Sequence, residues 1–295
     1  MVAQPLIGVV DIGTNSMRLL ITDGHDEVGR WVEVTGLGQG VDRTGTLSPD
    51  RIEETMRALA YFGSLMDEHA VGRRMAIATS ASRDASNRDV FFDLAESALG
   101  TRPILISGEE EAALAFSGAT AGVSLPPPVV VSDIGGGSTE FVTEAGGVSI
   151  DIGSVRLTER AVKSRPTPDA EIQAARALVA RLFERIDLDT GSLIGVAGTW
   201  TSLGAVAQGL PEYSRDRVHG HRMSRSDLAG VIEALAGMTL AETAAIPSLD
   251  PKRAPVILGG ALVAEGVMDV LAAEVVIVSE HDTLDGAAAQ LLALP

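Results

Sequence analysis

One short loop occurs twice in this 295-residue chain, and it constrains the fold more than any other feature. Asp11-Ile-Gly-Thr-Asn-Ser16 and Asp133-Ile-Gly-Gly-Gly-Ser138 each follow an apolar run and precede another. A charged residue stands seven positions after each aspartate, Arg18 in the first copy and Glu140 in the second. Two such loops at matching places indicate one structural plan that is used twice.

The order of apolar runs agrees with this duplication. The first half predicts strands at 6–11, 17–22, 31–35, 75–79 and 103–107, and helices at 48–69, 87–99 and 107–122. Ser107-Gly108-Glu109-Glu110 fits a capping box that opens the last of these helices. After three prolines the second half predicts 128–133, 139–143, 147–152, 169–186 (helix), 193–197, 201–208 (helix), 224–236 (helix), 253–271 (helix), 274–278 and 283–293 (helix). Residues 158–168 and 210–222 look irregular.

We therefore expect an α/β protein of two lobes with similar β-β-β-α-β-α-β-α topology and an interlobe cleft. The lobes would comprise residues 1–123 and 124–295. The final helix could belong to the second lobe or pack back on the first lobe.

Composition excludes several classes of protein. The net charge of -17 argues against a nucleic-acid partner, because the field of the whole molecule would repel a phosphate backbone. There is no cysteine, which excludes disulfides and thiol catalysis. The chain offers neither a signal peptide nor an apolar run long enough for a membrane span, so we expect a cytoplasmic protein without a membrane partner.

The second loop has the composition of an anion site. A turn of Gly135, Gly136 and Gly137 exposes backbone N–H groups, and the hydroxyls of Ser138 and Thr139 can add donors. The first copy can add donors from the segment Thr14-Asn15-Ser16. The alternative is a plain hairpin turn. No GxGxxG dinucleotide fingerprint and no GK[ST] sequence is present.

Asp11 and Asp133 each end an apolar strand, where a carboxylate is costly unless it is paired or bound to a metal. Oxygen ligands combined with a phosphate suit Mg²⁺. We therefore predict a magnesium site at these aspartates; the alternative is that each accepts N–H bonds from its own turn.

The paired loops resemble those of the actin, chaperone-ATPase and sugar-kinase superfamily. Within it, five segments resemble the exopolyphosphatase and guanosine pentaphosphate phosphatase family, namely ATSASRDA (78–85), ISGEEEA (106–112), SDIGGGSTE (132–140), GSVRLTER (153–160) and AGT (197–199). The resemblance runs from Val9 to about Gly286 and implies ribonuclease-H-like (actin-like) lobes in the short two-domain form.

The resemblance also implies roles for single residues. Glu111 would be the catalytic glutamate and Glu140 a second essential carboxylate. Asp133 would be linked to magnesium, and Arg83 would grip a substrate phosphate. In chemical terms Glu111 would take a proton from water, with its pKa raised by Glu110 and Glu140. The alternatives are helix stabilisation for Glu111 and a surface position for Arg83.

The resemblance implies an exopolyphosphatase that releases terminal phosphate from inorganic polyphosphate, and it suggests a homodimer. A phosphohydrolase acting on guanosine pentaphosphate, a sugar kinase and a non-enzymatic alarmone sensor remain alternatives. The chain departs from the family pattern at a position expected to help bind the substrate. The arginine expected in the last family segment, near the end of the resemblance, is replaced by Leu284. The turn at 197–199 could bind an anion or simply pack, and His219-Gly220-His221 is expected to be a loop.

Overall fold

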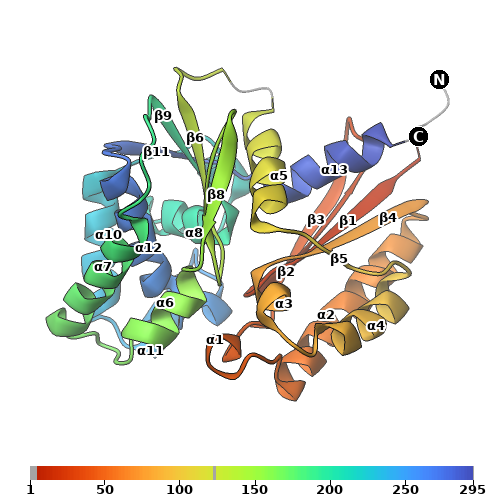
Figure 1. Cartoon of the computed structure of the whole chain (residues 1–295), viewed down its shortest axis with the longest axis horizontal. Helices are drawn as coiled ribbons and strands as arrows, with labels where there is room; N and C mark the ends of the chain where they lie inside the picture. Colours follow the sequence, from red (N-terminus) through yellow and green to blue (C-terminus); the bar gives the residue numbers. More distant parts are fainter. Residues whose placement is uncertain (1–4, 122–123, 295) are drawn as a thin grey trace. The chain divides into compact units, whose positions relative to one another are not determined.

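The computed structural model describes residues 5–121 and 124–294. It is an α/β structure with two compact units, here called unit 1 and unit 2 (Figure 1). Unit 1 contains the chain up to Gly118 and again from Thr283, and unit 2 contains Ala119–Asp282. The expected boundary at 123 falls on residues 122–123, which lie outside the described residues.

Unit 1 is built on a five-stranded mixed sheet in the order β3-β2-β1-β4-β5. Its strands are β1 (Ile7–Ile12), β2 (Ser16–Thr22), β3 (Glu27–Val34), β4 (Arg73–Ala78) and β5 (Ile104–Leu105). Its helices are α1 (Val41–Thr44), α2 (Pro49–Glu68), α3 (Ser80–Asp84), α4 (Arg88–Leu99) and α13 (Thr283–Ala293), and α5 (Gly108–Thr120) begins here.

Strand β1 explains the layers of unit 1, because its side chains point alternately to the two faces of the sheet. Val10 and Ile12 join the core under α2 and α4, and Ile7 and Val9 join a second cluster with residues of α13. The last helix of the chain thus packs on β1 and β2.

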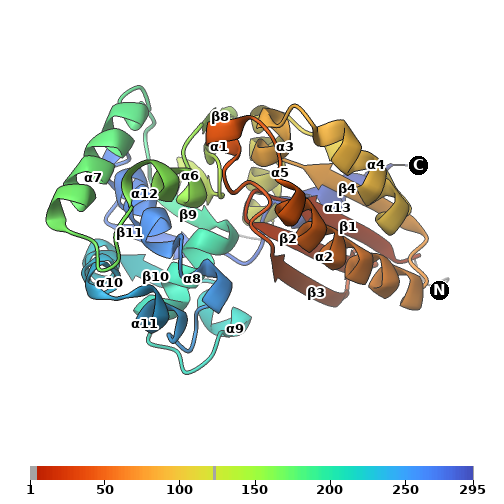
Figure 2. The same ribbon diagram turned by 90° about the horizontal axis from the view of Figure 1, so that it is seen from below.

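Unit 2 contains a six-stranded sheet in the order β10-β11-β9-β6-β7-β8. Its strands are β6 (Val129–Ile134), β7 (Thr139–Thr143), β8 (Gly146–Ile150), β9 (Ser192–Val196), β10 (Arg222–Ser224) and β11 (Val275–Val278). Its helices are α6 (Ser154–Ala161), α7 (Asp169–Phe183), α8 (Ala197–Ala207), α9 (Arg215–Val218), α10 (Arg225–Gly237), α11 (Leu240–Ala244), the 3-10 turn η1 (Pro251–Arg253) and α12 (Ile257–Val270). Figure 2 shows the same elements from below.

The two sheets share one topology, which confirms the predicted fold class. In each unit the first strand lies between the second and the fourth, and the third lies beyond the second. The strand beyond the fourth is β5 in unit 1 and β11 in unit 2. Unit 2 adds β10 as an extra edge strand, antiparallel to β11.

Some local predictions were wrong. Residues 158–161 belong to helix α6, and β10 begins inside the stretch expected to be irregular. Helix α8 begins at Ala197 rather than 201, and β5 has only two residues that pair with β4. Short elements depend on tertiary pairing more than on local periodicity, so the sequence signal for them is weak. Among the described residues no helix is both long and apolar enough to span a bilayer.

Candidate active site

The two repeated loops form the same turn. In each, the glycine N–H donates to the carbonyl of the serine three residues later, at 3.1 Å from Gly13 to Ser16 and 3.0 Å from Gly135 to Ser138. The loops connect the antiparallel pairs β1–β2 and β6–β7, and the charged residue seven positions on is the direct cross-strand partner of the aspartate. The spacing of seven residues in the sequence therefore corresponds to the same strand register in both units.

In unit 1 this register makes an ion pair. Arg18 donates from Nε (3.0 Å) and Nη2 (2.6 Å) to Oδ2 of Asp11, and both side chains are largely buried. The charge of Asp11 is thus balanced by a cation from within the protein.

Backbone contacts hold the first loop in place. The carbonyl of Asn15 accepts N–H bonds from Thr35 (3.0 Å) and Gly36 (2.9 Å), and the Thr14 hydroxyl accepts one from Ala81 (3.2 Å). Asn15 and Ser16 are half-buried on this turn. The turn is therefore anchored to the start of α3, which carries Arg83.

Arg83 and Glu111 come together across unit 1. Nη1 of Arg83, near the end of α3, donates to Oε2 of Glu111 (2.8 Å) and to the carbonyl of Ile106 (3.0 Å). Glu111 stands in the first turn of α5, where the expected capping box is present: Ser107 Oγ accepts from Glu110 N (3.1 Å), and Glu110 Oε2 accepts from Ser107 N (2.7 Å). The cap fixes where α5 begins, and so where Glu111 points.

The pKa of Glu111 is raised to about 7, mainly by burial and to a smaller extent by the negative charge of Asp11, while Arg83 and Arg18 act in the opposite direction. The expected raised pKa is present, with a different cause from the one predicted. Glu110 is committed to the helix cap, and its hydrogen bonds with Ser107 lower its own pKa. A carboxyl that titrates near neutral pH is suited to general base catalysis.

In unit 2 the glycine loop is held by the N-terminus of α6. The Gly135 carbonyl accepts from Ser154 N (3.0 Å), and the Gly136 carbonyl accepts from Val155 N (2.9 Å) and Arg156 N (3.1 Å). A Cβ on Gly153 would lie 2.6–2.7 Å from backbone atoms of Gly135 and Gly136. Glycine at 153 is therefore required for the helix to approach the loop.

The hydroxyl residues that follow the glycines are buried. Ser138 and Thr139 end the loop and start β7, and the Thr139 hydroxyl donates to the carbonyl of Ile152 (2.6 Å). This hydrogen bond connects the start of β7 to the segment before α6, a structural role that the sequence did not suggest.

Asp133 and Glu140 form a buried carboxylate pair on one face of the sheet. They are cross-strand partners, and Glu140 Oε1 accepts a hydrogen bond from Ser149 Oγ on β8 (2.6 Å). Like charges placed directly opposite each other are unfavourable, and burial increases the cost, so this pair needs a nearby cation or a proton.

This donor set fits Mg²⁺, which takes one or two carboxylates and completes its shell with water and phosphate oxygens. The described residues contain no cluster of three or more histidine, aspartate or glutamate side chains that could hold a metal.

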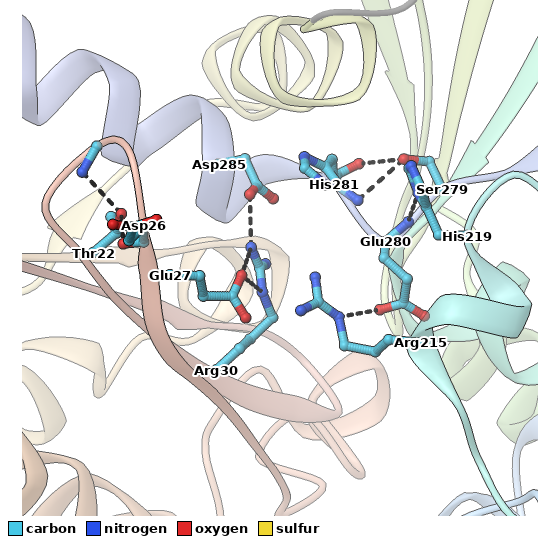
Figure 3. A network of polar contacts seen from close by, with 11 residues as sticks. Thr22, Asp26, Glu27, Arg30, Arg215, His219, Ser279, Glu280, His281 and Asp285 are labelled. Atoms are coloured by element: carbon cyan, nitrogen blue, oxygen red, sulfur yellow. Dashed lines mark hydrogen bonds and ion pairs between the residues drawn. The ribbon is translucent and has the colours of Figure 1, made fainter.

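Figure 3 shows a second polar network, around the segment 279–281 of unit 2. The Glu280 carboxylate accepts from Arg215 Nε (3.2 Å) and from the Tyr213 hydroxyl, and His219 Nδ1 accepts from the Glu280 N–H (3.2 Å). The rings of His219 and His281 are 5.0 Å apart. His219 thus takes part in a loop contact.

The Ppx/GppA phosphatase family matches residues 20–292. Exopolyphosphatase 2 of Mycobacterium tuberculosis is 41% identical, over 97% of this chain and 98% of its own length. The crystal structure of an exopolyphosphatase-like protein superimposes with a TM-score of 0.91 at 38% identity, covering 96% of this chain and 98% of that one. The Aquifex aeolicus Ppx/GppA enzyme gives a TM-score of 0.80 at 28% identity, with 97% and 99% covered. A family match over most of the length, on a fold whose two lobes carry the repeated loops, means that this chain belongs to the Ppx/GppA phosphatase family.

Proposed function

We propose that this protein is an exopolyphosphatase, which hydrolyses the terminal phosphoanhydride bond of inorganic polyphosphate with Mg²⁺ as cofactor. The observation that carries the proposal is the buried Glu111, bonded to Arg83 and with a pKa of about 7. A base and a phosphate-binding cation side by side are what hydrolysis of a phosphoanhydride requires. The relative with 41% identity bears the same activity in its name.

In this proposal Glu111 accepts the proton of the attacking water, and Arg83 binds oxygens of the terminal phosphate. Asn15 and Ser16 add donors from unit 1. In unit 2 the predicted anion nest consists of Gly135, Gly136, Gly137, Ser138 and Thr139. The amides of Gly136 and Gly137 and the Ser138 hydroxyl would be its donors, because the Gly135 N–H and the Thr139 hydroxyl already donate within the protein.

Asp133, with Glu140 opposite it, would hold the magnesium, with Asp11 as a further candidate ligand. The ion would offset negative charge on the phosphate oxygens. Of the two aspartates Asp133 suits the metal better, because the partner of Asp11 is the cation Arg18 and that of Asp133 is another carboxylate.

A sugar kinase is disfavoured by the turn at the start of α8. A kinase of this superfamily needs an open glycine pair there for adenosine, and this chain has Gly198 followed by Thr199. The guanidinium of Arg253 lies against Gly198, so that a Cβ at this position would be 2.3–2.6 Å from it. The face of the turn is therefore filled by an arginine.

The deciding experiment compares phosphate release from short polyphosphate, long polyphosphate, guanosine pentaphosphate and ATP, with Mg²⁺ present. We expect polyphosphate to be the best substrate and Glu111→Gln to lower kcat by about 10²–10⁴, the usual contribution of a general base. Binding of polyphosphate, measured by calorimetry, should stay equal or improve, because a negative charge is removed.

Glu110→Gln is the matched control, since Glu110 is exposed and only caps α5. It should keep kcat. If no phosphate were released from any of the four substrates, the protein would be a binding sensor and not an enzyme. If phosphate were released preferentially from guanosine pentaphosphate, that compound would be the substrate.

The metal is tested separately. EDTA should abolish turnover, and Asp133→Asn should need at least about tenfold more Mg²⁺ for half-maximal rate, because one of few ligands is lost. Asp151→Asn, at an exposed carboxylate near the end of β8, should leave the magnesium requirement unchanged. Full activity in EDTA would remove magnesium from the proposal. The homodimer that the resemblance suggests is checked by sedimentation of the purified protein, and the cytoplasmic location expected from the composition is checked by localisation.

A further inference from the structure

Two consecutive glycines near the start of α12 have no part in the function proposed above. Gly259 and Gly260 are the third and fourth residues of this helix, and both are buried. Apart from proline, glycine is the least favourable residue in a helix. A buried pair of them indicates that neighbouring elements approach the backbone of α12 too closely for a side chain.

Gly259 faces the first turns of α6. A Cβ at this position would overlap Oγ1 of Thr158 and would lie 2.8 Å from the carbonyl oxygen of Ser154. The same carbonyl accepts a hydrogen bond from the Thr158 hydroxyl (2.7 Å). Helix α6 therefore packs with its own backbone against the backbone of α12.

Gly260 faces two helices at once. Its Cβ would lie 2.7 Å from Cγ2 of Thr199 and 3.2 Å from Cβ of Ser154. Thr199 is in the first turn of α8, and Ser154 is the first residue of α6. The absence of a side chain at Gly260 therefore allows the first turns of both helices to pack on α12.

Ser154 connects this contact to the glycine loop. Its N–H (3.0 Å) and its hydroxyl (3.2 Å) both donate to the carbonyl of Gly135, and the next two amides of α6 donate to Gly136. A shift of α6 away from α12 would move all of these donors. We propose that Gly260, with Gly259 beside it, is a positioning residue for the glycine loop, because it fixes the first turn of α6 and this turn fixes the loop. The consequence for substrate binding rests on the function proposed above, in which the loop binds phosphate.

Hydrogen exchange measured by NMR tests the contact without reference to activity. The first three amides of α6 are protected by their bonds to the loop. Gly260→Ala should speed their exchange by about tenfold or more, because the added Cβ forces α6 away from α12. Gly266→Ala is the matched control, since its Cβ would overlap Val179 on α7 and so overpacks another part of the same helix. Both variants should lower Tm, but Gly266→Ala should leave the exchange of the three amides unchanged.

A second substitution makes the test stricter, because the atom nearest to a Cβ at Gly260 belongs to a methyl group. Thr199→Ser removes this methyl and keeps the hydroxyl. The double variant Gly260→Ala/Thr199→Ser should therefore recover most of the parental protection, and Thr199→Ser alone should change it little. No such relief exists for Gly259→Ala, because its Cβ would meet the backbone carbonyl of Ser154.

Steady-state kinetics on polyphosphate connect the contact to substrate binding. The loop would bind phosphate in the ground state and in the transition state alike, so its displacement should act on KM. Gly260→Ala should raise KM by about tenfold and change kcat by less than about threefold. Gly266→Ala should keep the parental KM, and the double variant with Thr199→Ser should return close to it.

Unchanged exchange of the α6 amides in Gly260→Ala, equally fast exchange in Gly266→Ala, or no recovery in the double variant would each overturn the proposal. If Gly260→Ala alone does not fold, the double variant decides, since Thr199→Ser should restore folding and a failure to do so contradicts the positioning role. Faster exchange in Gly260→Ala with an unchanged KM would support the positioning contact and would remove the glycine loop from the phosphate site of the proposed function.

Discussion

At the scale of single residues, two opposite effects act on the pKa of Glu111, which is paired with Arg83. Burial raises the pKa of Glu111, and the guanidinium of Arg83, 2.8 Å away, holds it down. The outcome is a carboxyl that titrates near neutral pH. In the proposed function, a phosphate bound by Arg83 would weaken the hydrogen bond of Arg83 to Glu111, so the same arginine would contribute both to binding and to the basicity of the glutamate.

This arrangement predicts a specific pH dependence. The base must be ionised to accept a proton, so kcat/KM should rise as pH increases through about 7. Arg83→Gln removes the group that lowers the pKa, and the rising limb should move to higher pH. It should also raise KM by the equivalent of about 1–3 kcal/mol, the range for a charge-assisted hydrogen bond.

Steady-state kinetics on polyphosphate between pH 5.5 and 9, a span of about two units either side of the expected pKa, measure both effects. Arg102→Gln, an exposed arginine paired with Asp93, is the control and should leave the profile in place. If the rising limb of the kcat/KM profile stayed at the same pH in Arg83→Gln, Arg83 would not affect the pKa of Glu111.

At the scale of elements, the first turn of α6 holds the glycine loop in place. Three of its amides bind the carbonyls of Gly135 and Gly136, and this is possible only because residue 153 has no side chain. The helix therefore sets the conformation of the loop that is proposed to bind phosphate.

Gly153→Ala should disrupt this contact. Its Cβ would stand 2.6–2.7 Å from backbone atoms, which cannot give way as the end of a flexible side chain could. A shift of the loop by about 1 Å should lower kcat/KM on polyphosphate by about 10²-fold. Gly230→Ala is the control, since nothing lies within 4 Å of its added Cβ and alanine favours a helix by up to about 1 kcal/mol. Parental kinetics for Gly153→Ala would show that the loop adapts.

At the scale of the whole molecule, unit 1 is assembled from both ends of the chain. Four residues of α13 complete a core cluster with β1 and β2, namely Leu284, Ala287, Ala288 and Leu291. Arg30 on β3 adds an ion pair to Asp285 on α13 at 2.6 Å (Figure 3). The stability of unit 1 therefore depends on residues that are far from β1 in the sequence.

Leu284→Arg tests this dependence, and it restores the arginine that the family resemblance leads one to expect. Leu284 is fully buried in this cluster, so an arginine would place a charge among apolar side chains at a cost of several kcal/mol. We expect a clear fall in Tm in thermal unfolding. Gln290→Arg, at an exposed position of the same helix, should change Tm little. An unchanged Tm for Leu284→Arg would mean that α13 contributes little to unit 1.

The sequence by itself determined the fold class, because the repeated loops and the periodicity of the apolar runs are local signals that each lobe displays separately. It also predicted the cap at Ser107, since a capping box needs only four consecutive residues. The proposed roles of Glu111, Arg83, Asp133 and Glu140 came from segments that resemble a known family, and they remain predictions.

Only the tertiary structure decided which charges meet. Strand register turned a spacing of seven residues into an ion pair in unit 1 and a carboxylate pair in unit 2. Burial, which depends on residues far away in sequence, set the pKa of Glu111, and the sequence had wrongly credited Glu110 with a part in this. The packing of α13 on β1, more than 250 residues earlier in the chain, is likewise outside the reach of local periodicity. Electrostatic energies depend on distance and solvation in three dimensions, and neither is encoded in the order of residues alone.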